Sequence, residues 1–277
     1  METTVSHSRS REVATLMRLI ELVSGDCRVQ IDPLHGGRIA SLEVAGLSLL
    51  VDNRPEPNAW GCYPMAPWAG RIRDGRFSFA GRSHSLPLNF GAHAIHGTTF
   101  DRPWCDEGDG TLSIELGDRW PFSGYAVQQF ALRDDALELR LEVHANAEPF
   151  PASLGWHPWF VRRLERGDSA VLSFSPDAMY RRDDVGIPTG ELVPPPPGPW
   201  DDCFTGMSAP PRVRWPGAIS LVLESDVDHW VVYDEPAHAL CIEPQTGPPA
   251  ALNIAPRIVS PGEPLVSHLA IRWTLDG

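Results

Sequence analysis

The segment ALELRLEVHA, residues 136–145, decides the fold class. Its apolar side chains occupy every second position, and these are Leu137, Leu139, Leu141 and Val143. Charged or titratable side chains fill the positions between them, which is the period-two pattern of a strand with one buried and one solvated face. The preceding pair Asp134–Asp135 is typical of a hairpin turn. The segment therefore predicts an antiparallel sheet.

The same alternation continues through the rest of the chain. Near the end, Leu269, Ile271, Trp273 and Leu275 alternate with His268, Ala270, Arg272 and Thr274. Shorter runs of this kind cover residues 39–44, 76–79, 219–223, 230–233 and 240–242. The 28 prolines and 24 glycines leave few windows for a helix, and only residues 13–23 satisfy helical spacing as well as a strand. We predict an all-β fold, a large antiparallel β-sandwich, formed by one domain over residues 1–277.

Composition limits the classes of function. The chain has 42% hydrophobic and 21% charged residues, as globular proteins do. Its net charge of −13, with arginine as the basic residue throughout, argues against a nucleic-acid partner. No apolar stretch reaches the 18 residues expected of a membrane span, and the N-terminal residues lack a signal-peptide pattern. Five scattered cysteines favour reduced thiols. We therefore expect a cytoplasmic protein with no membrane partner and a loose N-terminal tail over about residues 1–12.

Four stretches concentrate titratable side chains beside tryptophan, glycine and proline. They are AGRIRDGRF at 69–77, NFGAHAIHGTTF at 89–100, GWHPWF at 155–160 and CIEPQTGPPAALN at 241–253. We expect each to be a strand end that runs into a loop, because functional side chains of β-proteins concentrate there. The proline run at 193–200 predicts a stiff connection, either a spacer or a rigid lip beside a site.

In their order, these stretches resemble the aldose 1-epimerase family, the galactose mutarotases. The matching elements are Gly70-Arg71-Ile72, Leu88-Asn89, His93-Ala-Ile-His96-Gly97, Gly155 to Phe160, Asp201 to Phe204, and Glu243-Pro-Gln245 followed by Asn253. The resemblance extends over about residues 20–275. It implies a galactose-mutarotase-like supersandwich and a cofactor-free isomerase that interconverts the α and β anomers of a free hexose.

The resemblance also implies a role for particular residues. Glu243 matches the general base of the family and His157 its general acid. Arg71, His96 and Asp201 match substrate-binding residues, with Asp202 as the alternative aspartate. We add Gln245 and Trp156 as predicted substrate contacts, although either Trp156 or Trp159 can supply the apolar surface for a sugar ring. Gly155-Trp156-His157 stands where galactose-specific members carry Asn-His, which leaves the preferred sugar open.

The chemistry of anomer exchange fits these two residue types. A proton must leave the hydroxyl on C1 and another must reach the ring oxygen, so that the hemiacetal opens and closes on the other face. A carboxyl with an ordinary pKa near 4.3 and an imidazole near 6.5 can perform both transfers, each worth on the order of 10²- to 10⁴-fold. No cofactor is needed. We expect the two groups to flank the hemiacetal from opposite sides.

The same residues allow other interpretations. His157 beside proline and tryptophan can be a hydrogen-bonded structural residue. His93 and His96 lie three apart, but they have no HExxH motif or cysteine pair beside them, so we predict no metal site. The cleft can belong to a sugar-binding module without turnover, or Asp201 and Glu243 can act as a glycosidase pair. A phosphosugar mutarotase would need arginines at the cleft mouth, for which Arg73 and Arg76 are candidates.

Overall fold

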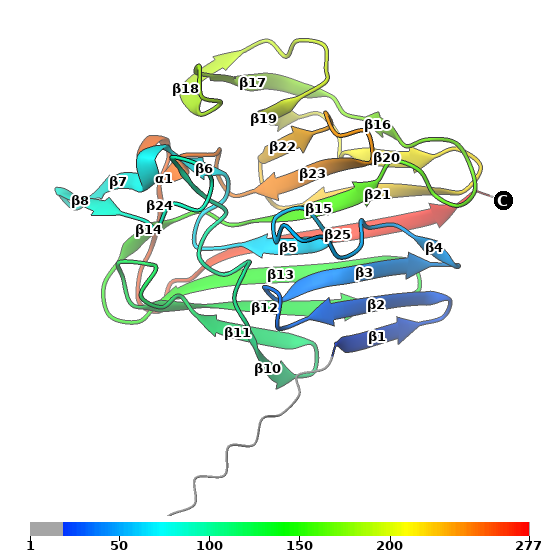
Figure 1. Cartoon of the computed structure of the whole chain (residues 1–277), viewed down its shortest axis with the longest axis horizontal. Coiled ribbons are helices and arrows are strands. Elements are labelled where there is room, and N and C mark those ends of the chain that lie inside the picture. The colour runs from blue at the N-terminus through cyan, green and yellow to red at the C-terminus, as the bar shows by residue number, and fades with distance from the viewer. Residues whose placement is uncertain (1–18, 277) are drawn as a thin grey trace, which may run out of the picture.

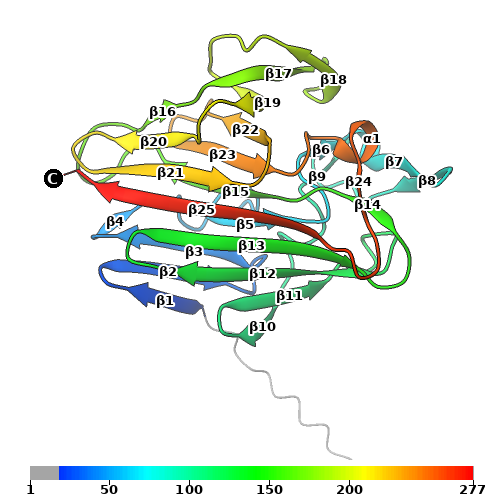
Figure 2. The same ribbon diagram turned by 180° about the vertical axis from the view of Figure 1, so that it is seen from behind.

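The computed structural model describes residues 19–276, and two large antiparallel sheets form its body (Figures 1 and 2). The larger sheet contains, in spatial order, β1 (Ile20–Ser24), β2 (Cys27–Asp32), β3 (Arg38–Val44), β5 (Cys62–Met65), β15 (Gly155–Val161), β23 (Ala239–Gln245), β22 (His229–Tyr233), β19 (Asp201–Met207), β17 (Pro176–Arg182) and β18 (Pro188–Val193), with β4 (Leu47–Ser48) paired to β3. The predicted all-β sandwich is confirmed. The predicted N-terminal tail lies outside the described residues.

The second sheet has eight strands and covers one face of the first. Its spatial order is β10 (Cys105–Gly108), β11 (Thr111–Glu115), β12 (Gly124–Leu132), β13 (Ala136–Ala145), β25 (Leu265–Leu275), β21 (Ile219–Ser225), β20 (Arg212–Trp215) and β16 (Val171–Ser173). The segment 136–145 is strand β13 and pairs with β12 and β25 over most of its length. Every period-two run named above forms or lies within a strand.

Three two-stranded ladders and two short helical turns gather at one end of the sandwich (Figure 1). They are β6 (Arg71–Ile72) with β9 (Ala94–Ile95), β7 (Arg76–Phe79) with β8 (Arg82–Ser85), β14 (Phe150–Ala152) with β24 (Arg257–Val259), the 3-10 turn η1 (Arg73–Gly75) and α1 (Ala251–Ile254). Neither helical turn approaches the length of a membrane span, and no other helix occurs in residues 19–276.

The main core lies between the two sheets. Leu137, Leu139, Leu141 and Val143 of β13 are all at most 2% exposed and belong to the same apolar cluster as Val29 and Leu42 of the opposite sheet. Burying a side chain of this size stabilises the fold by about 1.5–3 kcal/mol. A second, smaller apolar cluster lies on the other face of the larger sheet and includes Tyr63, Phe100, Trp159 and Cys241.

Strand β15 divides its side chains between these two clusters. It pairs with β5 on one side and β23 on the other, and the pairs Gly155–Gln245 and Trp159–Cys241 bracket His157 and Glu243. Trp156 is fully buried in the main core, where its Nε1 donates to Gln128 Oε1 at 3.0 Å. Because side chains alternate along a strand, His157 and Trp159 face the other way. GWHPWF is therefore a mid-sheet strand, and the expectation of a strand end at this position is wrong.

Candidate functional site

A cleft of about 370 Å³ lies over the face of the larger sheet that carries the second apolar cluster. Its size falls in the usual range of small-molecule sites, about 300–1,000 Å³. Four neighbouring strands supply its floor with two residues each: His157 and Trp159 from β15, Glu243 and Gln245 from β23, Val231 and Tyr233 from β22, and Asp201 and Cys203 from β19. Within each strand the two residues are two positions apart, as one face of a sheet requires.

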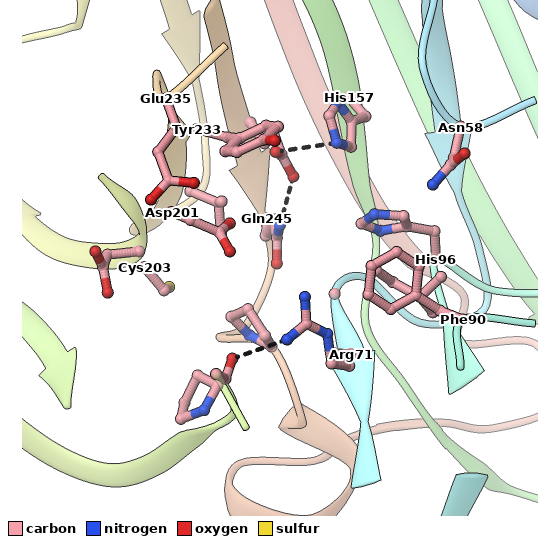
Figure 3. A pocket seen from close by; sticks show the side chains of 18 of the residues that line it. Asn58, Arg71, Phe90, His96, His157, Asp201, Cys203, Tyr233, Glu235 and Gln245 are labelled. Atoms are coloured by element: carbon pink, nitrogen blue, oxygen red, sulfur yellow. Dashed lines mark hydrogen bonds and ion pairs between the residues drawn. The ribbon is translucent and has the colours of Figure 1, made fainter. Parts of the chain in front are cut away.

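The predicted acid and base touch each other on this floor (Figure 3). His157 Nε2 lies 3.2 Å from Glu243 Oε1, and Gln245 Nε2 donates to Glu243 Oε2, also at 3.2 Å. All three residues are at most 5% exposed. The structure thus brings both predicted catalytic residues and Gln245 together. The expectation that the two groups lie on opposite sides of a hemiacetal is not met, because they lie side by side in direct contact.

Burial controls the protonation of this pair. It raises the pKa of Glu243 well above its ordinary value, and the nearby Asp201 raises it further. It lowers the pKa of His157 well below its ordinary value, with a smaller contribution from His96. A buried site disfavours net charge, so the pair is most stable when it holds one proton in total. Moving that proton across the 3.2 Å contact converts a neutral pair into a carboxylate and an imidazolium.

Arg71 reaches the cleft from the β6–β9 ladder. Its Nη1 donates to the carbonyl of Val185 at 2.9 Å, and its guanidinium carbon lies 4.9 Å from the ring centre of Phe90. Its Nε is buried and has no hydrogen-bond partner among the described residues. The ladder pairs Arg71 with Ile95, the residue before His96, which places the two predicted contacts beside each other.

His96 has a left-handed backbone, with φ of 58°, which is uncommon for a residue with a side chain. The next residue, Gly97, has φ of +84°, and a Cβ there would lie 1.9 Å from the carbonyl oxygen of Ala66. Burial lowers the pKa of His96 to about 3, so its imidazole is neutral and offers one donor and one acceptor. Its Nδ1 has no partner among residues 19–276, and its ring stands perpendicular to that of His157 at 5.1 Å.

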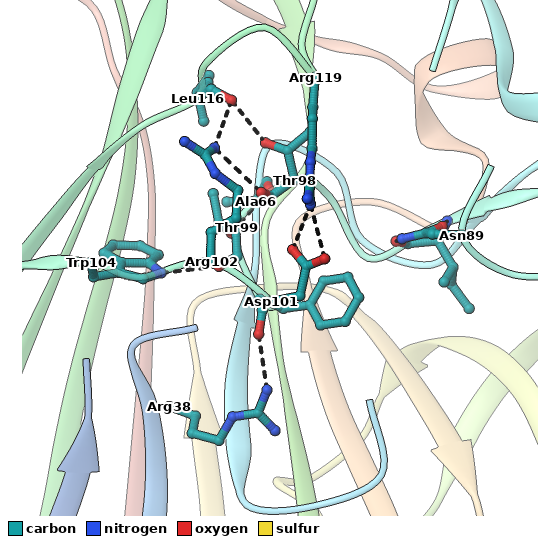
Figure 4. Close-up of polar contacts among 12 residues, drawn as sticks. Arg38, Ala66, Asn89, Thr98, Thr99, Asp101, Arg102, Trp104, Leu116 and Arg119 are labelled. Atoms are coloured by element: carbon teal, nitrogen blue, oxygen red, sulfur yellow. Dashed lines mark hydrogen bonds and ion pairs between the residues drawn. The ribbon is translucent and has the colours of Figure 1, made fainter. Parts of the chain in front are cut away.

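The loop after His96 is held from beneath by buried polar contacts (Figure 4). Thr99 Oγ1 donates to the carbonyl of Ala66 at 3.1 Å, and Arg38 Nη2 donates to the carbonyl of Phe100 at 2.9 Å. Arg38 is fully buried, and burial lowers its pKa to about 10, so it stays charged at neutral pH. These contacts fix the strained backbone that aims His96 at the cleft.

Two aspartates and one arginine form the opposite wall. Arg182, the last residue of β17, contacts Asp201 through Nη1 at 3.1 Å and Asp202 through Nε at 2.7 Å. Burial raises the pKa of Asp201, and Arg182 opposes that shift. Both aspartates line the cleft, but Asp201 shares the floor face with Cys203 and points toward Gln245 (Figure 3). The structure favours Asp201 for the predicted contact.

The tryptophan prediction needs correction. Trp156 was expected to contact substrate, but it is fully buried in the main core and does not line the cleft. Trp159 lines the cleft instead and stacks on His157 with ring centres 5.2 Å apart. The physical reason is the strand period, since a residue two positions from His157 shares its face and a neighbour does not. That signal was present in the sequence.

Several cleft residues had no signal in the sequence. Arg182 and Tyr233 lie in ordinary strand patterns, and Glu56, Asn58 and Glu235 lie in connecting segments. Arg73 and Arg76, the candidate arginines for a phosphate group, do not line the cleft. Arg73 forms an ion pair with Asp183, and Arg76 is exposed.

The chain matches a known protein family and part of a curated protein. Residues 18–272 match the family model of aldose 1-epimerase. A curated relative, the uncharacterized protein YphB of Escherichia coli (strain K12), is 34% identical over 105 residues, which spans 36% of this chain and 36% of YphB.

Solved structures match over nearly the whole chain. A galactose mutarotase-like protein from Clostridium acetobutylicum has a TM-score of 0.82 at 17% identity, and the match covers 92% of this chain and 95% of that one. Galactose 1-epimerase from Lactobacillus acidophilus NCFM has a TM-score of 0.77 at 16% identity, with 94% and 95% covered. At these identities the structures show a shared fold.

Proposed function

Since the chain belongs to the aldose 1-epimerase family, we propose that it interconverts the α and β anomers of a free hexose, with Glu243 as general base and His157 as general acid. The observation that carries the proposal is the buried 3.2 Å contact between His157 Nε2 and Glu243 Oε1 on the cleft floor. The galactose 1-epimerase of Lactobacillus acidophilus shares the fold, which adds support. We place the activity in the cytoplasm, as the scattered cysteines of the sequence favour.

The reaction needs only proton transfers. With the proton on His157, the Glu243 carboxylate takes the proton of the C1 hydroxyl while His157 delivers its proton to the ring oxygen. The bond between C1 and the ring oxygen breaks, and the open-chain aldehyde forms. Rotation about the C1–C2 bond turns the other carbonyl face to the ring hydroxyl. Closure then reverses both transfers, so that His157 is protonated and Glu243 is a carboxylate again.

The surroundings support His157 rather than His96 as the proposed general acid. Both imidazoles are buried and both have lowered pKa values, but only His157 has a carboxyl group within ion-pair distance among the described residues. Glu243 can therefore supply the proton that His157 passes on. His96, neutral at physiological pH, is suited to hydrogen bonds with hydroxyl groups, as are Arg71 and Gln245.

Cleft charge favours a neutral sugar over a phosphorylated one. Two arginines line the cleft, Arg71 and Arg182, and the second is already paired with two aspartates. Five carboxyl groups line it as well: Glu56, Asp201, Asp202, Glu235 and Glu243. A phosphate would meet an excess of like charge, and phosphate sites instead concentrate arginine.

Anomer-resolved NMR tests the proposal directly. Freshly dissolved α-glucose and α-galactose should reach anomeric equilibrium faster with the protein than without it. The protein should accelerate the equilibration of glucose 6-phosphate much less. Glu243→Gln keeps the size of the side chain and the contact to Gln245 but removes the base. An undiminished rate in that variant, with an unchanged circular dichroism spectrum, would remove Glu243 from the mechanism. Saturable sugar binding without any acceleration by the unaltered protein would favour the binding module instead.

A further inference from the structure

The turn between β17 and β18, residues 183–187, lies at the rim of the cleft and is held in shape by Asp183. Its Oδ1 accepts hydrogen bonds from the backbone N–H groups of Val185 at 3.0 Å and Ile187 at 3.1 Å, and its own N–H donates to the carbonyl of Ile187 at 3.0 Å. β18 is the last strand of the larger sheet and pairs with β17 alone among the described strands (Figure 1). Strand pairing therefore leaves the outer side of this hairpin unsupported, and other contacts must fix the turn over the cleft.

Two arginines of the β6–η1 segment supply such contacts. Arg71 Nη1 donates to the carbonyls of Val185 at 2.9 Å and Gly186 at 3.5 Å. Arg73 Nη2 forms an ion pair with Asp183 Oδ2. Gly186 has φ of +77°, and a Cβ there would lie 2.8 Å from Arg71 Nη1, so the close approach of the turn to Arg71 requires glycine. One arginine thus grips the backbone of the turn and the other grips its only side chain that shapes it through hydrogen bonds.

The place of the turn decides the direction of both arginines that line the cleft. The guanidinium of Arg71 points into the cleft (Figure 3), and because Nη1 is bound to the turn, Nε and Nη2 remain for the hydroxyls of a ligand. Arg182 directly precedes Asp183 and contacts Asp201 at 3.1 Å and Asp202 at 2.7 Å. A displacement of the turn would therefore release Arg71 and move Arg182 at the same time.

We propose that Arg73 is a positioning residue whose ion pair with Asp183 holds this turn at the cleft rim. The turn in that place keeps Arg71 and Arg182 directed at the sugar. Arg73 does not line the cleft, and its side chain is 47% exposed, so it acts through Asp183 and not by touching substrate. The inference rests on the proposed function, because it takes the ligand of both cleft arginines to be the sugar.

Mutarotation kinetics with variants of Arg73 test this inference. Arg73→Met keeps much of the length of the side chain and removes its charge, and it should raise KM for glucose by about two- to fivefold, the range expected from a partly exposed ion pair, with kcat unchanged. Arg73→Lys restores the charge and should return KM to that of the unaltered protein. The matched control is Arg76→Met, which removes an exposed arginine that has no ion pair within residues 19–276 and does not line the cleft. An unchanged KM in Arg73→Met, or an equal rise in Arg76→Met, would overturn the inference.

The other partner of the ion pair gives a second, independent test. Asp183→Asn keeps an oxygen that can accept from Val185 and Ile187 but removes the charge, so it should raise KM as much as Arg73→Met does. The double variant should raise KM no further, because both changes break the same contact. Added salt screens exposed charges, so the ratio of KM in Arg73→Met to KM in the unaltered protein should fall toward one at high ionic strength. Effects on KM that multiply in the double variant, or a ratio that salt does not change, would refute a role for this ion pair.

The outcomes separate this inference from the function on which it rests. If the protein accelerates glucose mutarotation in a Glu243-dependent manner and KM is the same in Arg73→Met, only the positioning role of Arg73 fails. If the unaltered protein does not accelerate mutarotation at all, the proposed function itself fails and the inference fails with it.

Discussion

The floor and the rim of the cleft are built in opposite ways. His157 and Glu243 stand in the middle of strands that are paired on both sides, and each is at most 5% exposed. The rim comes from the sheet edge and from connecting segments, such as the β17–β18 hairpin with Arg182 and the segment with Glu56. The Arg182 side chain is 30% exposed, and Glu56 is exposed.

This difference separates reactivity from selectivity. Two side chains whose pKa values move in opposite directions need a water-poor environment and a fixed separation, and paired strands provide both. A sugar is recognised by hydroxyl contacts that differ between substrates, and exposed edge residues can change without disturbing the core. We expect substitutions on the floor to change kcat and substitutions on the rim to change KM.

The largest expected effect is on the floor pair. His157→Gln and Glu243→Gln should each lower kcat by about 10²- to 10⁴-fold, because each removes one partner of a coupled proton transfer. The double variant should lose little more than either single variant, since the remaining group cannot act alone. Polarimetry on glucose gives all three rates. Losses that multiply in the double variant would show that the two side chains act independently.

The pH dependence of kcat/KM should report the single shared proton. At low pH the pair gains a second proton and loses its base, and burial lowers the pKa of His157, so this limb lies below the ordinary imidazole pKa of 6.5. At high pH the pair loses its last proton, and burial raises the pKa of Glu243, so that limb lies well above the ordinary pKa of a carboxyl group. Each limb should fall about tenfold per pH unit. A flat profile after subtraction of the uncatalysed rate would contradict the shared proton.

The smallest expected effect is on the rim. Arg182→Met leaves Asp201 and Asp202 without their cation and should raise KM for glucose by about three- to tenfold, with kcat changed less. Arg181→Met is the matched control. Arg181 precedes Arg182 on the same strand, pairs with Glu191 at 3.0 Å and does not line the cleft, so its loss should leave both constants unchanged. A fall in kcat alone for Arg182→Met would place that residue in the chemical step.

Sequence patterns predicted the residues of the cleft floor better than those of the rim. Period-two alternation in residues 136–145 was enough to predict the β-sandwich. The family motifs predicted His157 and Glu243, whose side chains are in contact. The prediction for Trp156 is wrong because neighbouring residues of a strand face opposite sides of the sheet, so Trp156 is buried in the main core while His157 faces the cleft. Arg182 could not be predicted as a cleft residue, since its position depends on the pairing of the β17–β18 hairpin with β19 at the edge of the larger sheet, and no local pattern encodes such long-range pairing.

The placement of His157 also limits how β15 can change over evolutionary time. Its pairs with β5 and β23 put the imidazole on one side and the indole of Trp156 on the other. Deleting or inserting a single residue early in this strand would exchange the two, with a basic ring buried among leucines and an inert one above Glu243. Insertions or deletions in β15 are tolerable only in steps of two residues. In an alignment of proteins that keep this chemistry, gaps should therefore fall in the neighbouring loops and not within the strand.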